Sequence, residues 1–294
     1  MKNGMRKLRS FTEKFMQLLF TVFGLVTVGC VLLITGYLVV SGIPAIVKIG
    51  PVNFLFGTKW ASTAAEPSFG ILPFILTSVY GTCGAVLFGV PIGFFCSVYL
   101  SKVAPKKLRA AAELAVSILA GIPSVVYGLV GMLIVVPTVR SVFHIPDGAG
   151  LLSAIVVLSV MILPSIIKVS LTALDAVPKE YEEGSLALGA TSTETFFRVS
   201  VPAAESGIAA SVVLGVGRAI GEAMAVMMVS GNASSNMPGL FRSVRFLTTA
   251  VASEMSYSGG LQRQALFSIA LVLFFFIMLM NALLNLILKR ERNK

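Results

Sequence analysis

An arginine and a glutamate stand four residues apart in a stretch of the chain that otherwise avoids charge. Residues 215–224 read GVGRAIGEAM, within a run from 206 to 231 built mainly of Val, Ala, Met, Leu, Gly and Ser. On a continuous helix Arg218 and Glu222 would share one face and lie within reach of each other. The guanidinium of Arg218 is a fixed fork of donors that can hold two oxygens of an oxyanion. Two interpretations stay open: a self-neutralising ion pair that locks helices together, or part of an anion path in which Glu222 orients Arg218.

The composition decides what kind of element must carry this pair. The 294 residues are 56% hydrophobic and only 12% charged, with a mean hydropathy of +0.92, which is unlike a soluble domain of this size. We therefore predict an all-α integral membrane protein with six transmembrane helices. Apolar runs long enough to cross a hydrocarbon core of ~30 Å recur at 15–40, 71–100, 112–139, 151–172, 206–231 and 264–288. The first run is about twice the length of a signal-peptide h-region, so we expect it to be retained.

Positive charge gives the orientation, because Lys and Arg resist translocation. They gather before the first run, between the second and third, between the fourth and fifth, and at the C-terminal end. Both termini are therefore expected in the cytoplasm, and the net charge of +10 indicates topology and contact with membrane lipid rather than nucleic acid. The predicted parts are a cytoplasmic segment 1–14, a membrane domain 15–288 that includes the cytoplasmic connection 173–204, and a cytoplasmic tail 289–294.

Several kinds of chemistry are disfavoured. Cys30, Cys83 and Cys96 lie in apolar runs without CxxC spacing, so we expect small core residues rather than a disulfide framework or metal cluster. His144 is the only histidine, which argues against a zinc site and against histidine acid/base catalysis. No GxxxxGK[ST] pattern occurs, so any ATP is expected on another subunit. No catalytic residue, metal ligand or cofactor is predicted on this chain.

Prolines recur within the apolar runs. A proline frees a backbone carbonyl, which in a membrane must be met by a neighbour or by water in a cavity. A kink that improves packing explains most such prolines, whereas three of them near mid-membrane with polar neighbours favour a polar pathway. The residues concerned are Pro91, Pro123, Ser124, Tyr127, Pro164 and Ser165. The two long outer connections are 41–70 and 232–263, and the second begins NASSNMPG, as expected of a solvated loop.

The connection between the fourth and fifth runs is too long for a simple turn. Residues 178–202 read PKEYEEGSLALGATSTETFFRVSVP. A helix is expected to start at Pro178, with acidic residues near its positive end, and to end at Gly189 in the left-handed conformation. Thr191 and Glu194 have capping-box spacing and should start a second helix carrying Phe196 and Phe197. We expect this helix–turn–helix to turn its charges to water and its apolar residues, Leu186 and Leu188 among them, to the bundle.

This connection resembles that of the permease subunits of ABC importers. Their loop reads EAA, three residues, Gly, nine residues, I-x-L-P; here Glu183-Gly184-Ser185 precedes Gly189 and Val199-Ser200-Val201-Pro202 at the same spacings. The resemblance implies the type I ABC importer permease fold and a coupling helix that docks on an ATPase subunit. An ordinary interfacial amphipathic helix is the alternative. The residues to which the resemblance gives an ATPase-coupling role are Glu182, Glu183, Gly184, Leu188, Gly189, Ala190, Thr191 and Pro202.

A narrower resemblance covers most of the chain. The stretches NFLFGTKW, FGILPFILTSVYGT, LAGIPSVVYGLVG, VLSVMILPSIIKVS, LALGAT and GRAIGEAMAV are similar, in this order, to PstC-type permeases of phosphate importers. Ala223 stands where that family is expected to have Thr. The resemblance implies a bacterial cytoplasmic (inner) membrane protein that moves phosphate past Arg218 and Glu222. It also implies a homologous PstA-like permease, an ATPase dimer carrying ATP and magnesium, and an external phosphate-binding protein as partners.

Other functions stay open at this point. A permease for another oxyanion, such as sulfate or molybdate, would have the same architecture. An ion-coupled secondary transporter could use Glu222 as a proton carrier, but it would need no ATPase-docking loop and would often show two similar halves. A purely structural membrane scaffold would leave Arg218, Glu222 and the glycine turn without a use.

Overall fold

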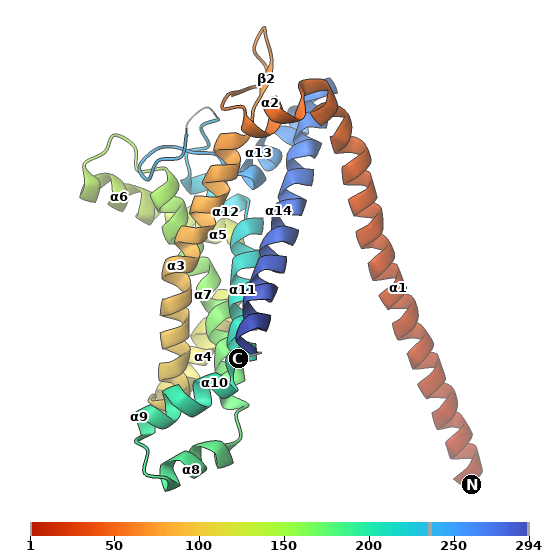
Figure 1. Ribbon diagram of the computed structural model, residues 1–294, viewed down its shortest axis with the longest axis vertical. Coiled ribbons are helices and arrows are strands. Elements are labelled where there is room, and N and C mark those ends of the chain that lie inside the picture. Colours follow the sequence, from red (N-terminus) through yellow and green to blue (C-terminus); the bar gives the residue numbers. More distant parts are fainter. Residues whose placement is uncertain (1, 235–236, 293–294) are drawn as a thin grey trace.

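The structure is a helical bundle with one long helix that diverges from it (Figure 1). The computed structural model describes residues 2–234 and 237–292, and it describes side chains from residue 13 onward except at 285 and 287–292. Most side chains of the predicted cytoplasmic segment 1–14 and of the tail 289–294 therefore lie outside the described residues.

The N-terminal half contains the only β-hairpin among the described residues, in which Trp60 pairs with Phe69. Its elements are α1 (Lys2–Ile49), α2 (Pro51–Phe56), β1 (Trp60–Ala61), β2 (Ser68–Phe69), α3 (Leu72–Lys102), α4 (Lys106–Gly121), α5 (Ser124–Val130), the π-helical turn η1 (Gly131–Val135) and α6 (Val136–Phe143).

The C-terminal half alternates long helices with short ones. Its elements are α7 (Leu151–Asp175), α8 (Lys179–Ala187), α9 (Ser192–Thr195), the π-helical turn η2 (Phe196–Ser200), α10 (Val201–Ala203), α11 (Glu205–Gly221), α12 (Met224–Val229), α13 (Leu247–Glu254), the 3₁₀ turn η3 (Met255–Tyr257) and α14 (Gly260–Arg292).

Five helical segments in the described residues are long and apolar enough to cross a membrane. They fall in α1, α3, the stretch from α5 to α6, α7 and α14. A sixth span results if the segment 192–203 and α11, which meet at a bend of 68°, are counted together. The predicted number of six spans is thus reached, with a sharp bend where the fifth begins.

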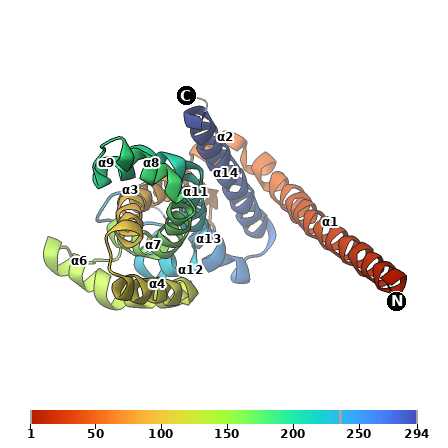
Figure 2. The same cartoon turned by 90° about the horizontal axis from the view of Figure 1, so that it is seen from below.

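Helix α7 lies at the centre of the bundle. The most apolar window of this helix is 61% buried, whereas that of α3 is 28% buried. Helix α3 packs closely against it because glycines on α3 face bulky side chains on α7: a Cβ at Gly89 would lie 2.6 Å from Cδ1 of Ile162. From below, α7 is enclosed by α3, α4 and α11 (Figure 2). Helix α7 is therefore the common packing partner of these helices, and their polar residues are positioned against it.

A second core closes the end of the bundle that carries the hairpin. Phe54, Trp60, Phe74, Leu247 and Leu266 are buried together there, from α2, β1, α3, α13 and α14. The predicted outer connections 41–70 and 232–263 are therefore largely ordered helix and hairpin. The expectation of a solvated loop applies only to the first part of the second connection, before α13.

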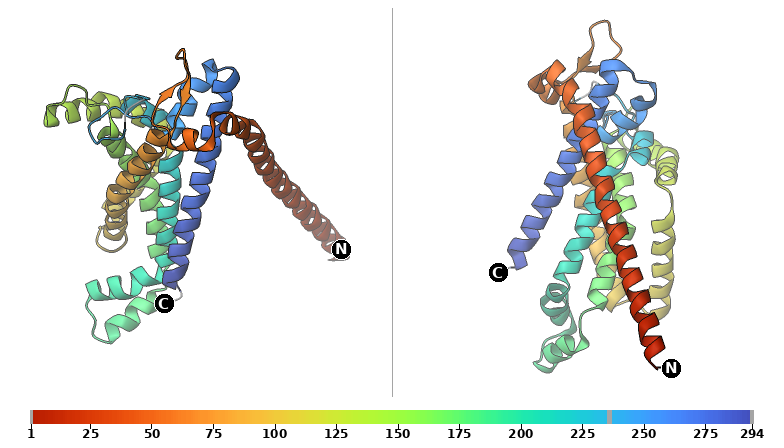
Figure 3. Two further views of the ribbon diagram at one scale, coloured as in Figure 1. Left: turned by 45° about the horizontal axis from the view of Figure 1, so that its top comes forward. Right: turned by 90° about the vertical axis from the view of Figure 1, so that its right-hand side faces the viewer.

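Helix α1 packs on the bundle only through its C-terminal part, where Tyr37 contacts Phe267 of α14 and Ala45 is buried. The apolar window between residues 13 and 49 is 0% buried, and Figure 3 shows its N-terminal part far from the other helices. Near its other end, the hydroxyl of Ser268 on α14 donates to the carbonyl of Gly42 at 2.5 Å. Only this end of α1 is attached to the bundle.

Two expectations about local structure are wrong. The predicted third span 112–139 is interrupted: α4 ends at Gly121, and Pro123 is the N-cap of α5 in extended conformation. Proline cannot continue the hydrogen-bond ladder of α4, so a break replaces the expected kink. Cys30 and Cys83 are exposed, so they are not core residues of this chain, because apolar membrane spans also turn side chains outward. Cys96 is half-buried and packs against the cluster of Leu100, Ile167 and Leu171.

Candidate functional site

The expected continuous helix through Arg218 and Glu222 is wrong. Helix α11 ends at Gly221, Glu222 is extended with φ −72° and ψ 128°, and α12 begins only at Met224. The two residues therefore do not occupy successive turns of one helix, and the described structure contains no ion pair between them. The sequence interval of four suggested a helical pair because nothing in GRAIGE marks the break.

Arg218 instead faces helices α7 and α5. One terminal nitrogen of its half-buried guanidinium donates to Oγ of Ser165 at 3.4 Å, which is a long contact. Tyr127 on α5 lies within electrostatic range of this positive charge. A guanidinium has five N–H donors, so most of them have no protein acceptor among the described residues. The structure thus brings together Arg218 and Ser165, both of which stand in stretches predicted to line a polar pathway.

Glu222 has a different task. Its Oε1 accepts from the backbone N–H of Ala225 at 2.9 Å, and so caps the first turn of α12. Its own carbonyl accepts from Oγ1 of Thr248 on α13 at 2.7 Å. The residue therefore stabilises the α11–α12 break from both sides and ties it to the outer end of the bundle.

The other predicted pathway residues lie around the same region. The hydroxyl of Tyr127 donates to the carbonyl of Leu119 at 2.7 Å, which bridges the break between α4 and α5. Ser124 is half-buried in the first turn of α5, directly after Pro123. Pro164 is buried inside α7, next to Ser165. The proline in α7 thus directly precedes Ser165, and Tyr127 bridges the break at Pro123.

The glycines beside Arg218 face open space. A Cβ added at Gly217 or at Gly221 would meet no atom within 4 Å. The spacing of Gly217 and Gly221 is that of a GxxxG motif, which favours the close approach of another helix. No helix in the described part of this chain makes that approach, and a partner helix there remains a prediction.

The cytoplasmic connection has the local structure that its sequence predicts. Pro178 is the N-cap of α8, and Gly189 has φ +89°, the left-handed region that favours glycine. Thr191 and Glu194 form a complete capping box at the start of α9. Glu182 lies in the first turn of α8, close to the positive end of the helix dipole. The expected helix, glycine turn and second helix are confirmed.

A polar tether, which we did not anticipate, fixes this connection to the bundle. Glu182 forms an ion pair with Lys102 at the end of α3 and accepts from Oγ of Ser200 in η2 at 2.8 Å. Burial alone would raise the pKa of Glu182, but the hydrogen bonds from Lys102 and Ser200, with the charge of Lys102, outweigh it and lower the pKa. Glu182 was singled out only as part of a motif, since its partners lie 80 and 18 residues away.

The outward faces of α8 and of the turn after it differ from expectation. Leu188 is 91% exposed, and Leu186 and Tyr181 are also exposed, so these apolar residues do not pack on the bundle. Glu183, Gly184 and Ala190 lie on the same short helix–turn unit, and Pro202 stands in the first turn of α10. Exposed apolar side chains on a polar helix indicate a surface that another protein covers.

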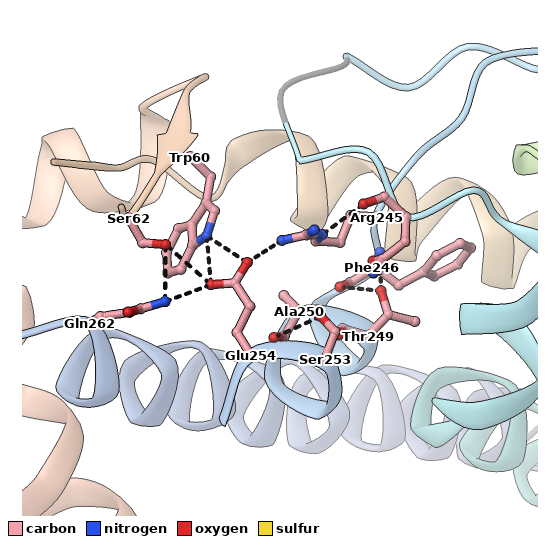
Figure 4. A network of polar contacts seen from close by, with 10 residues as sticks. Trp60, Ser62, Arg245, Phe246, Thr249, Ala250, Ser253, Glu254 and Gln262 are labelled. Atoms are coloured by element: carbon pink, nitrogen blue, oxygen red, sulfur yellow. Dashed lines mark hydrogen bonds and ion pairs between the residues drawn. The ribbon is translucent and has the colours of Figure 1, made fainter. Parts of the chain in front are cut away.

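A polar network on the opposite end of the molecule also escaped the sequence interpretation. The carboxylate of Glu254 on α13 accepts from the indole of Trp60 at 3.2 Å and forms an ion pair with Arg245 (Figure 4). Gln262 and Ser62 complete the network. It joins the hairpin, α13 and the start of α14 into one outer cap; the single tryptophan of the chain was its only visible signal.

With this geometry in place, comparison with known proteins decides the family. Residues 89–293 match the model of the "Binding-protein-dependent transport system inner membrane component" family. The chain belongs to this family of importer permeases. A "Probable ABC transporter permease protein YqgH" of Bacillus subtilis is 36% identical to this permease over 95% of this chain and 93% of its own length. The "Phosphate transport system permease protein PstC" of Haemophilus influenzae is 34% identical over 76% of each chain.

Solved structures confirm the fold. The permease is similar to a chain of the MetNI methionine ABC transporter in an inward-facing conformation, with a TM-score of 0.60 and 21% identity over 75% of this chain and 95% of that one. A bacterial ABC transporter involved in alginate import gives a TM-score of 0.57 at 15% identity over 84% and 93% of the two chains. The fold is that of type I ABC importer permeases, and these two importers carry different substrates.

Proposed function

We propose that this permease moves inorganic phosphate into the cytoplasm as one half of a permease pair. The observation that carries the proposal is the guanidinium of Arg218, which lies within the membrane domain with most of its donors free of protein acceptors in the described structure. An arginine at the membrane centre costs roughly 2.5–3.5 kcal/mol on insertion scales, so a position facing a wet path and a polar ligand is expected. Relatives named as phosphate permeases support phosphate as that ligand.

In this proposal Arg218 binds the oxyanion, and Ser165 supplies a hydroxyl group beside it. Glu222 shapes the path by holding the helix break open rather than by pairing with Arg218. No carboxylate of the described residues pairs with Arg218, which favours anion binding, because a permanently neutralised arginine would attract phosphate weakly. No covalent chemistry is assigned to this chain, and no cofactor is proposed on it.

The proposed motor is an ATPase dimer that binds ATP and magnesium and docks on the surface formed by Tyr181, Leu186 and Leu188. The proposed homologous permease is PstA-like, and an external phosphate-binding protein would meet the outer cap. The N-terminal end of α1 and the C-terminal end of α14 lie toward the same end of the molecule as α8 and α9 (Figure 1). This placement supports both termini facing the cytoplasm of a bacterium, with the chain in its inner membrane.

The test is phosphate uptake by the complete complex in proteoliposomes, driven by ATP on the ATPase side. We expect accumulation of radiolabelled phosphate that excess unlabelled phosphate abolishes and that excess sulfate or molybdate leaves intact. Uptake of sulfate or molybdate in place of phosphate would keep the permease and overturn the substrate. The permease reconstituted alone should neither hydrolyse ATP nor accumulate phosphate; proton-driven uptake by the isolated chain would favour a secondary transporter.

A further inference from the structure

Below the Arg218 contact, helix α7 carries a lysine that the proposed path has not used. Lys168 stands three residues after Ser165, so it follows on the same face of α7 about 4.5 Å further along the axis. Because the side chains of a helix tilt toward its N-terminus, the side chain of Lys168 leans back in the direction of Ser165. Lys168 is exposed and has no hydrogen-bond or ion-pair partner for its ammonium among the described residues.

A cavity of about 170 Å³ opens beside Lys168, between α4 and α7. Cavities of this size with polar walls hold several water molecules. Its charged lining consists of Lys168, Arg109, Glu113 and Asp175. Asp175 lies at the end of α7, about 10.5 Å beyond Lys168 along the axis. The cavity therefore spans the last part of the membrane domain before the cytoplasmic connection.

The other charged side chains that line this cavity form ion pairs with one another. The guanidinium of Arg109 donates to Glu113 at 2.7 Å and forms an ion pair with Asp175. Asp175 also accepts from Oγ of Ser101 at 3.0 Å. Without Lys168 the two carboxylates would exceed the single guanidinium by one negative charge. An anion that left Arg218 toward the cytoplasm would then meet net repulsion.

We propose that Lys168 is a second cation on the inward path, which accepts the oxyanion from Arg218 and keeps the α4–α7 cavity neutral while the anion leaves. The inference rests on the proposed function, because it concerns the release side of the same path. A compact ammonium suits a transient contact, since it offers point attraction without the two-pronged grip of arginine. Lys168 is therefore a transient binding residue on the release side of the path, and capture depends on Arg218.

The experiment measures phosphate uptake against the concentration of phosphate-loaded binding protein, per assembled complex, in proteoliposomes. For Lys168→Gln we expect kcat to fall about tenfold because the cavity gains a net negative charge, with KM unchanged because capture lies upstream. Lys168→Arg should keep most of the rate. Lys107→Gln removes an exposed lysine of α4 that does not line the cavity, and it should transport like the unmodified complex.

A second substitution separates charge balance from a merely structural role of Lys168. Adding Glu113→Gln to Lys168→Gln restores a neutral cavity, so we expect it to recover at least half of the lost kcat. A lysine that only anchored α7 at the membrane boundary would show no such recovery, and that result overturns the inference.

The outcomes also distinguish this inference from the function on which it rests. Full uptake by Lys168→Gln, in a preparation where Arg218→Gln is inactive, would leave phosphate transport standing and remove the role of Lys168. An equal loss with Lys107→Gln would also overturn it, because any surface lysine would then suffice. A complex that moves no phosphate, with or without substitutions, refutes the proposed function itself and this inference with it.

Discussion

The connection 178–202, called the loop below, and the α11–α12 break are both interruptions of helical structure, but their backbone groups find partners in different ways. In the loop, the N–H of Gly189 donates to the carbonyl of Leu186 at 2.9 Å, and the Thr191–Glu194 box closes over three residues. At the break, the carbonyl of Glu222 is met by Thr248, which lies 26 residues away on another helix. The turns of the loop are closed by neighbouring residues, whereas the break combines a local cap, from Glu222 to Ala225, with a partner on a distant helix.

The strongest way to test this contrast is at the break itself. We expect Arg218→Gln to lower phosphate uptake about 50-fold, because a hydrogen bond to a charged group contributes roughly 1.5–3 kcal/mol. Since Arg218 and Glu222 form no ion pair here, adding Glu222→Gln should not restore uptake. Glu222→Gln alone should be mild, because an amide oxygen can still accept from the N–H of Ala225. Uptake of labelled phosphate per assembled complex measures all three, and recovery in the double variant would contradict the geometry.

In the loop, the decisive position is the glycine turn. Gly189→Ala places a Cβ at φ +89°, and the strain of a left-handed non-glycine residue, about 1–2 kcal/mol, should lower ATPase association about tenfold. The matched control is Gly184→Ala on α8, where a Cβ meets no atom within 4 Å and φ is not left-handed. Co-purification of the ATPase and its stimulated hydrolysis report the effect. Equal behaviour of the two variants would mean that the turn geometry is not what presents α8.

A smaller effect is expected where the break meets α13. Thr248→Val keeps the shape of the side chain and removes the hydroxyl that donates to Glu222, which should cost about 1 kcal/mol and a few degrees of Tm. Thr138→Val is the control, because that hydroxyl only donates back to the carbonyl of Ile134 four residues earlier. Thermal unfolding of the assembled complex compares the two; an equal shift would show that the Thr248 contact is not special.

The smallest effect concerns the tether of the loop to α3. The folded pKa of Glu182 lies below its ordinary value of 4.5, so its ionised form stabilises the fold above that value and the contribution is lost as pH falls through the lowered pKa. The difference in Tm between the unmodified complex and Glu182→Gln should therefore stay constant from about pH 8 to pH 5.5 and shrink only below about pH 4.5. A difference that changed near pH 7 would argue against the ion pair with Lys102.

What could be predicted from the sequence are the features set by neighbouring residues, and what could not are the features set by distant ones. The six spans depend on apolar length, and Pro178, Gly189, Thr191 and Glu194 act through their nearest neighbours, so their structure could be read locally. The tether from Glu182 to Lys102 and the network around Glu254 required knowledge of which distant segments meet. The break at Glu222 was missed for the same reason, since a helix continues by default unless a tertiary partner such as Thr248 replaces its hydrogen bonds.

The local closure of the 178–202 connection has an evolutionary consequence. A segment whose turns and caps are complete within itself can be exchanged between related chains as a unit, provided that its anchors on the bundle, the ion pair with Lys102 and the packing of Phe196 on Leu174, are kept. If this surface meets the ATPase as proposed, a permease lineage can acquire a different motor by altering Tyr181, Leu186 and Leu188 while its cargo path stays as it was. Motor choice and cargo choice would then be inherited as separate traits.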